Sequence, residues 1–205
     1  MELLLFKNVI SNREIDIILE IGRPKLNRAR VINEGTADLK TKSKFLTVEV
    51  DFRIAKNTWI DDAEHPAVAA ISRRVSDFTG LTIDYAENLQ LANYGLAGHY
   101  EPHFDMYQTP NTTHGNRVAT VLFYLSNVEA GGATVFEDLD VTLFPSNNDA
   151  VFWYNIRPSG FPEIYSRHGG CPVLKGNKWV ANKWLHEFGQ EFVRPCGLKE
   201  NKITD

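Results

Sequence analysis

The chain has 205 residues, enough for one domain with a complete hydrophobic core or at most two small ones. Its net charge of -4 and pI near 5.9 argue against a protein that binds a nucleic-acid backbone, which needs a basic face. No apolar run approaches the roughly 20 residues of a membrane span, and the opening MELLLFK is too short for a signal-peptide core. We therefore expect no nucleic-acid or membrane partner, and a chain that is either cytosolic or the mature part of a longer protein.

Two helices and several strands are predicted in the first third of the chain. Ser11 and Glu14 form the S-x-x-E pattern of a helix N-terminus, and the apolar stripe that follows ends at 22–24. Pro66 begins a second predicted helix, which ends at Gly80. Strands are predicted at 3–9, 29–31 and 45–54, with a polar surface loop at 33–44.

Short strands rich in β-branched and aromatic residues dominate the rest of the chain. They are predicted at 117–125, 132–136, 140–144, 150–154, 171–174 and 178–185. Gly, Pro, Asn and Ser turns separate them, as in a sandwich or barrel. The predicted fold class is α+β, with a jelly-roll core at 85–190, an N-terminal support region of helices and strands at 1–84 and a C-terminal extension at 191–205.

The stretch 88–105 ends in a His-x-Asp pair. Side chains two apart on a strand point the same way, so His103 and Asp105 share a face. An imidazole and a carboxylate aimed together are two-thirds of the set of ligands that holds non-haem Fe(II). So short a motif more often marks an ordinary half-buried strand, and the metal hypothesis therefore needs a third ligand.

Five further histidines could supply that ligand: His65, His99, His114, His168 and His186. His65 precedes a helix-starting proline and His114 lies in a polar loop, so both are expected at the surface, and His186 is expected to be structural. His168 is the best candidate because it begins a late strand and two glycines follow it, which gives the backbone room near a bulky site.

Lys178 is a candidate for binding an anion. Alternation along 178–185 puts Lys178, Val180, Asn182 and Trp184 on one face and Trp179, Ala181, Lys183 and Leu185 on the other. A lysine inside a barrel needs an anion, because an unpaired buried ammonium is costly. The alternative is a solvent-facing lysine, which we predict for Lys183. For Lys178 both interpretations stay open, since a bulge at Gly169 and Gly170 could reset the register.

Seven segments in order then resemble one family: YEPHFD, NRVATVLFYLSN, GGATVF, AVFWYN, RHGGCPVL, GNKWVANKWLHE and QEFVRPC. They are similar to the catalytic domain of animal collagen prolyl 4-hydroxylase α subunits, over nearly the whole chain. Those enzymes are Fe(II)- and 2-oxoglutarate-dependent dioxygenases on a double-stranded β-helix. The resemblance implies hydroxylation of peptidyl proline in collagen-like chains, giving 4-hydroxyproline, succinate and CO2, with L-ascorbate as a further cofactor.

The resemblance also implies roles for individual residues. The catalytic iron ligands would be His103, Asp105 and His168; the 2-oxoglutarate site would include Lys178, Tyr94 and Thr120; the substrate proline would lie against Tyr100 and Trp184. Composition leaves Cys171 and Cys196 as free thiols or one disulfide, and the resemblance favours the disulfide and the lumen of the endoplasmic reticulum. The glycosylation sequon at Asn111 is compatible with that compartment.

Departures from the family limit these expectations. The N-terminal dimerisation region and peptide-binding domain of the α subunits have no counterpart here, so we expect a fragment, a splice form or a reduced relative, which would bind protein disulfide isomerase only as part of a longer α subunit. Differences at 38–57 and 108–116 lie beside the expected substrate site. Two alternatives therefore stand: a 2-oxoglutarate oxygenase acting on another proline-containing protein, and a catalytically idle module that binds proline-rich peptides. The presence of all three predicted ligands and of Lys178 argues against the idle module.

Overall fold

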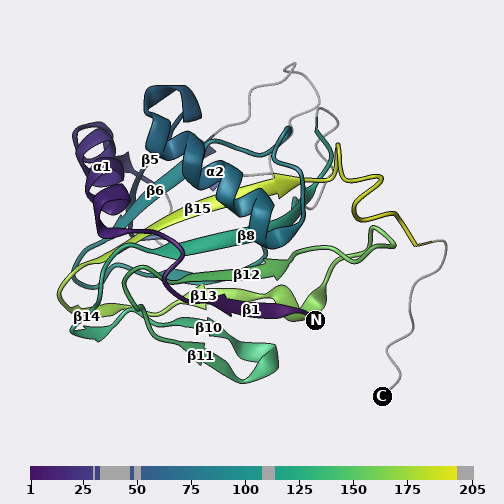
Figure 1. Cartoon of the computed structure of the whole chain (residues 1–205). Helices are drawn as coiled ribbons and strands as arrows, with labels where there is room; N and C mark the ends of the chain where they lie inside the picture. Colours follow the sequence, from purple (N-terminus) through teal and green to yellow (C-terminus); the bar gives the residue numbers. More distant parts are fainter. Residues whose placement is uncertain (30, 33–46, 49–51, 108–113, 198–205) are drawn as a thin grey trace, which may run out of the picture.

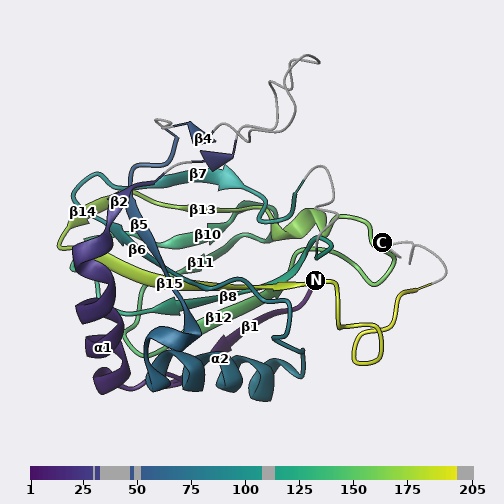
Figure 2. The same cartoon turned by 90° about the horizontal axis from the view of Figure 1, so that it is seen from above.

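A computed structural model describes residues 1–29, 31–32, 47–48, 52–107 and 114–197. Two antiparallel sheets face each other, and two helices cover the outer side of the larger sheet (Figures 1 and 2). In spatial order the larger sheet contains β1 (Leu3–Phe6), β12 (Ala150–Tyr154), β8 (Arg117–Tyr124), β15 (Lys178–His186), β6 (Leu89–Tyr94), β5 (Lys56–Ile60) and β2 (Asn27–Arg28). The smaller sheet contains β11 (Val141–Leu143), β10 (Thr134–Phe136), β13 (His168–Gly170) and β7 (Tyr100–His103). The α+β jelly-roll prediction is confirmed.

The remaining elements are short. Two-stranded ladders join β9 (Ala130–Gly131) to β14 (Val173–Lys175) and β3 (Val31–Ile32) to β4 (Thr47–Val48). The 3-10 helices are η1 (Arg23–Lys25), η2 (Asp62–Glu64), η3 (Glu137–Leu139) and η4 (Ile164–Ser166). In the part of the chain that the structure describes, no helix is long and apolar enough to cross a membrane.

The two helices, α1 (Asn12–Gly22) and α2 (Pro66–Thr79), begin where the sequence predicts. The Ser11 hydroxyl accepts a hydrogen bond from the backbone N–H of Glu14, whose carboxylate accepts one from the backbone N–H of Ser11. This capping box satisfies N–H groups that a helix start otherwise leaves unpaired. At its end α2 turns into Gly80, whose φ of 69° is left-handed and favours glycine.

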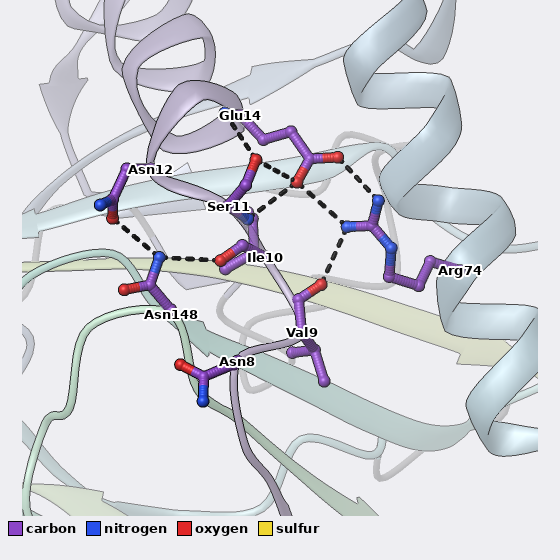
Figure 3. A pocket seen from close by; sticks show the side chains of 8 residues that line it. All are labelled: Asn8, Val9, Ile10, Ser11, Asn12, Glu14, Arg74 and Asn148. Carbon is purple, nitrogen blue, oxygen red and sulfur yellow. Dashed lines mark hydrogen bonds and ion pairs between the residues drawn. The ribbon is translucent and has the colours of Figure 1, made fainter.

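A polar depression lies where β1 leads into α1 and faces α2 (Figure 3). Arg74 of α2 donates to the Glu14 carboxylate and to the backbone oxygen of Val9, each at 2.8 Å. Asn148, on the turn before β12, donates to the backbone oxygen of Ile10 at 2.8 Å. Because these groups satisfy one another, the network fixes α1 against α2 and the end of the sheet.

Apolar side chains fill both spaces between the layers. Between the helices and the larger sheet lie Ile15, Ile18, Val68, Ile71, Leu91, Phe123 and Leu185. Between the two sheets lie Tyr94, Leu122, Tyr124, Phe136, Trp153 and Val180. The second space also holds the polar side chains of the candidate site.

Lys183 contradicts the sequence prediction. It is 3% exposed rather than solvent-facing, because the helices cover that side of β15. Its ammonium lies 3.6 Å from a carboxylate oxygen of Asp62, at the turn before α2. Alternation assigned the correct face, but the sequence did not show that both faces of this central strand are buried.

The predicted disulfide is absent from the structure. Cys171 and Cys196 are free thiols. The backbone N–H of Cys171 bonds to Ala133, beside the smaller sheet, whereas Cys196 is exposed in an irregular segment beyond β15, where Gly197 bonds to Pro158. The two cysteines are thus anchored to different parts of the fold.

Several strand predictions need revision as well. Of the predicted strand at 29–31, Val31 begins β3 and Ala29 follows the end of β2, and β5 was not predicted. Most of the predicted strand at 45–54, the loop at 33–44 and the sequon at Asn111 lie outside the described residues. At the end of that strand, Arg53 forms an antiparallel bridge with Tyr100 and so extends the smaller sheet beyond β7.

Candidate functional site

His103, Asp105 and His168 meet between the two sheets. His103 ends β7, His168 begins β13, and the two are direct partners in the ladder. Asp105 lies two residues beyond β7, with its carboxylate oxygens 3.6 Å from Nε2 of His103 and 3.8 Å from Nε2 of His168. One potential ligand atom from each residue lies within 4.8 Å of the others. The three residues therefore form a donor set that could hold one metal ion.

Backbone carbonyls orient both imidazoles. Nδ1 of His103 lies 2.8 Å from the backbone oxygen of Glu101, and Nδ1 of His168 lies 2.9 Å from that of Ser166. A carbonyl can only accept a hydrogen bond, so the proton of each neutral ring belongs on Nδ1. The lone pair is left on Nε2, which faces Asp105, as a metal ligand requires.

Burial and mutual charge set the protonation of the cluster. Burial lowers the pKa of His168 to about 4, although the neighbouring Asp105 acts in the opposite direction. Burial by itself would raise the pKa of Asp105, but His168 and His103 hold it well below its usual range. Near neutral pH the site therefore offers a neutral His168 and an anionic carboxylate. Two imidazole nitrogens and one carboxylate suit Fe(II) and leave other coordination positions open.

Thr120 supports the Asp105 carboxylate from the larger sheet. Its hydroxyl on β8 donates to Oδ2 of Asp105 at 2.8 Å and accepts from Nδ2 of Asn155 at 2.9 Å. Hydrogen bonds of this kind fix the orientation of a metal ligand. Thr120 was expected to line a co-substrate pocket, and its contact with Asp105 gives it a further role in positioning.

Lys178 is a buried cation at the start of β15. It is 4% exposed and stands opposite Tyr94 of β6, with its ammonium 5.7 Å from the Tyr94 ring. Its Nζ donates to the Thr134 hydroxyl at 3.2 Å, which also accepts from Tyr124. Burial lowers the pKa of Lys178 to about 8. No carboxylate among the described residues forms an ion pair with it, so an anionic ligand would offset the cost of its burial.

Two polar atoms in the same interior have no hydrogen-bond partner among the described residues. Nε1 of Trp153 and Oδ1 of Asn155 are buried without a hydrogen-bond partner within the described part of the chain. The Trp153 ring lies 4.7 Å from the ring of His168, and Asn155 bonds to Thr120 beside Asp105. Buried polar groups without partners are uncommon in native folds. The Nε1–H of Trp153 is a donor and, together with Lys178, fits an anionic co-substrate such as 2-oxoglutarate, whereas Oδ1 of Asn155 can only accept a hydrogen bond.

Tyr100 lies against the metal cluster. Its ring stacks on that of His103 at 3.5 Å, and the Arg53 guanidinium lies 4.6 Å above it. Arg53, 7% exposed, also donates to Gln90 of β6 at 2.9 Å. Burial raises the pKa of Tyr100 to about 12, so the phenol stays neutral.

Trp184, the other predicted substrate contact, is largely covered. It is 5% exposed, with the guanidinium of Arg117 3.9 Å from its ring and the Trp59 ring 5.8 Å away. Of the residues predicted for the site, Cys196 is not part of this arrangement, and Cys171 lies near enough to Lys178 for its charge to act on the ammonium. The others line the interior between the sheets.

The sequence analysis missed a buried ionic network behind Trp184. Arg117 donates to Glu87 at 2.8 Å and to the backbone oxygen of Asp105 at 3.4 Å, and Nε2 of His186 lies 2.9 Å from Glu87. Burial would raise the pKa of Glu87, but Arg117 and His186 lower it to about 2. A charged residue at the head of the apolar run 117–125 was the available signal. The structural role predicted for His186 agrees with these contacts.

Comparisons with known proteins point to the same kind of site. Residues 89–186 match the family described as 2OG-Fe(II) oxygenase superfamily. The chain is 50% identical over 204 residues to prolyl 4-hydroxylase subunit alpha-2 of Caenorhabditis elegans, which covers 96% of this chain and 36% of that protein. It is 48% identical over 201 residues to the human subunit alpha-1, and the match covers 95% of this chain and 36% of that protein. This chain thus spans about a third of the length of the curated relatives it matches.

A solved structure shares the fold. The viral collagen prolyl hydroxylase of Paramecium Bursaria Chlorella virus-1, determined as a 2OG complex, superposes with a TM-score of 0.72 at 22% identity. The match covers 91% of this chain and 96% of the viral chain.

Proposed function

Since the chain belongs to the 2OG-Fe(II) oxygenase superfamily, we propose that it is a prolyl 4-hydroxylase that uses Fe(II) and 2-oxoglutarate. The observation that carries the proposal is a pair of features in one interior: the His103, Asp105 and His168 donor set, and the unpaired buried ammonium of Lys178. A metal site alone would fit many proteins. A metal site beside a buried cation that has no carboxylate partner among the described residues favours an anionic co-substrate.

The residues would divide the work as follows. His103, Asp105 and His168 would hold Fe(II) through Nε2, a carboxylate oxygen and Nε2. Lys178, with the Thr134 hydroxyl beside it, would bind the distal carboxylate of 2-oxoglutarate by a charge-assisted hydrogen bond.

The remaining roles concern support and substrate. Thr120 would keep Asp105 in position, Tyr94, whose ring lies 5.7 Å from the Lys178 ammonium, would line the 2-oxoglutarate site, and Tyr100 would border the substrate proline. Fe(II) and 2-oxoglutarate, when bound, supply the oxygen chemistry: one atom of O2 goes to succinate as CO2 leaves, and the other goes to C4 of the proline. The chain's own contribution is to orient the co-substrate, place the proline and restrict access of water.

The proposal extends to a proline-rich, collagen-like peptide as substrate and to L-ascorbate as the reductant that keeps the iron ferrous. The names of the relatives support a prolyl substrate, and the resemblance of the sequence supports its collagen-like character and the use of ascorbate. We also propose residence in the endoplasmic reticulum lumen, and association with protein disulfide isomerase where the chain is part of a longer α subunit. Co-purification of that isomerase with the chain from lumenal extracts tests both together.

Turnover of 2-oxoglutarate by the purified chain tests the function directly. With Fe(II), ascorbate and a Pro-Pro-Gly repeat peptide, we expect peptide-dependent succinate and a mass gain of one oxygen atom per oxidised proline. Succinate without peptide oxidation would point to a different protein substrate. Iron binding with no succinate under any of these conditions would contradict the proposal.

A further inference from the structure

Trp59 is an exposed aromatic residue on the side of β5 that faces the candidate site. Its neighbours Thr58 and Ile60 point toward Gly22 of α1, so alternation turns Trp59 toward the smaller sheet. It stands opposite Gln90 of β6, which binds the Arg53 that covers Tyr100. Trp59 is 42% exposed, so much of its ring is open to a ligand.

The two aromatic residues nearest the metal cluster have less surface to offer a ligand. Trp184 is 5% exposed, between Arg117 and Trp59. Tyr100 has His103 stacked on its ring and the Arg53 guanidinium over it. Of these three rings, Trp59 therefore has the most open surface. Its ring lies 5.8 Å from that of Trp184 at an angle of 51°, so the two indoles support each other.

We propose that Trp59 determines specificity by binding a second prolyl ring of the substrate, next to the proline that is oxidised. The inference rests on the proposed function and names a subsite for it. A proline-rich chain adopts the polyproline II helix in advance, and aromatic surfaces recognise it because flat prolyl rings pack on them with little further loss of entropy. Trp59 thus makes the enzyme prefer runs of prolines over isolated ones.

The contacts of Trp59 place this subsite beside the reaction centre. One route runs through Trp184 and Arg117, which donates to the backbone oxygen of Asp105. The ring of Trp59 contacts that of Trp184, and no ring contact joins it to the metal ligands or to Lys178 among the described residues. Loss of its ring would consequently weaken peptide binding while leaving the 2-oxoglutarate site intact.

Peptide binding is the sharpest test. Dissociation constants are measured without oxygen, with Mn(II) and 2-oxoglutarate present, for fluorescent Pro-Pro-Gly and Ala-Pro-Gly repeats of equal length. The ratio of the two constants is the preference for the extra proline. We expect Trp59→Ala to reduce that preference by about fivefold, the effect of one aromatic contact, and Trp59→Phe to retain part of it. Phe144→Ala, at an aromatic residue 71% exposed beyond β11, serves as the matched control and should keep the wild-type preference.

Steady-state kinetics then separate binding from structure. Trp59→Ala should raise the KM for the Pro-Pro-Gly peptide, with the KM for 2-oxoglutarate and kcat unchanged. The inference is overturned if the wild-type chain shows no preference, or if Trp59→Ala weakens both peptides equally, which would mean a purely structural role. A wild-type preference without hydroxyproline would instead refute the proposed activity and leave the subsite standing.

Discussion

Replacing Lys178 by Met should stabilise the protein while it abolishes binding of 2-oxoglutarate. The natural lysine holds an ammonium in an interior where it is 4% exposed and has only the Thr134 hydroxyl as a hydrogen-bond partner among described side chains. Methionine has a similar length and no charge, so it removes the cost of burial without creating a large cavity. The lysine is then a group retained for binding at the expense of stability.

The magnitude follows from the pKa. Burial brings the pKa of Lys178 from 10.5 to about 8, and at about 1.4 kcal/mol per pKa unit this costs the folded state about 3 kcal/mol. The variant loses the hydrogen bond to Thr134, worth about 1 kcal/mol. We therefore expect the free energy of unfolding to rise by about 2 kcal/mol near pH 7.

The rise in the free energy of unfolding caused by Lys178→Met must become smaller as the pH increases. Below pH 8 the lysine is protonated in both the folded and the unfolded chain, so the full cost is present. Between pH 8 and 10.5 the unfolded chain holds more protons, so the natural protein becomes more stable as the pH rises. The advantage of Lys178→Met should therefore shrink across this range.

Urea unfolding near pH 7 and near pH 10 measures the difference in free energy of unfolding between Lys178→Met and the natural chain. Chelator is present and 2-oxoglutarate is absent. Lys175→Met is the control: its side chain is 71% exposed and pairs with an exposed Glu129, so a change within about 0.5 kcal/mol is expected. Added 2-oxoglutarate should stabilise only the natural chain. A Lys178→Met chain that is no more stable at either pH would refute the reasoning that the ammonium is a buried, unpaired charge.

Three further predictions concern the metal site and the first helix. His168→Ala should abolish Fe(II)-dependent succinate formation and leave the chain folded by circular dichroism, because it removes one of three ligands; full activity would mean that another residue binds the metal. Thr120→Val should weaken metal binding about 10- to 100-fold, measured by competition with a chelating dye, since Asp105 loses its orienting hydrogen bond; Thr120→Ser should restore most of the affinity. Ser11→Ala should lower the free energy of unfolding by about 1 kcal/mol through loss of the helix cap; Ser11→Asp, which can also cap, should cost less, and equal losses would argue against capping.

Sequence patterns predicted the features that are set by residues near one another in the chain. The capping box at Ser11 and the helix from Pro66 each follow from residues close together in sequence. His103 and Asp105 do lie together, but β7 ends at His103 and Asp105 lies beyond it, so strand alternation does not account for their placement. The phase of β15 was also correct, and the bulge allowed for at Gly169 appears as a register shift between His168 and Gly170.

What the sequence could not predict depends on which elements pack together. The two glycines after His168 were expected to make room for a bulky site. A Cβ on Gly169 would meet Pro102 of β7 at 3.3 Å, so its room serves the neighbouring strand, whereas a Cβ on Gly170 would lie 3.9 Å from Nζ of Lys178, at the site. Lys183 is buried because helices cover its face, and Arg53 is brought to Tyr100 by a bridge across the sheet. Such contacts join segments far apart in the chain, for which no periodic pattern exists.

The placement of the predicted ligands on adjacent strands has a mechanical consequence. His103 and His168 face each other across the ladder of β7 and β13, at the place where its register shifts. An ion held by both would cross-link the two strands at this irregular point of the ladder. Bound iron would thus stabilise the pairing of β7 and β13 in addition to its catalytic role. Its removal should speed hydrogen exchange in β7 and β13, while β8 and β15 in the larger sheet stay protected.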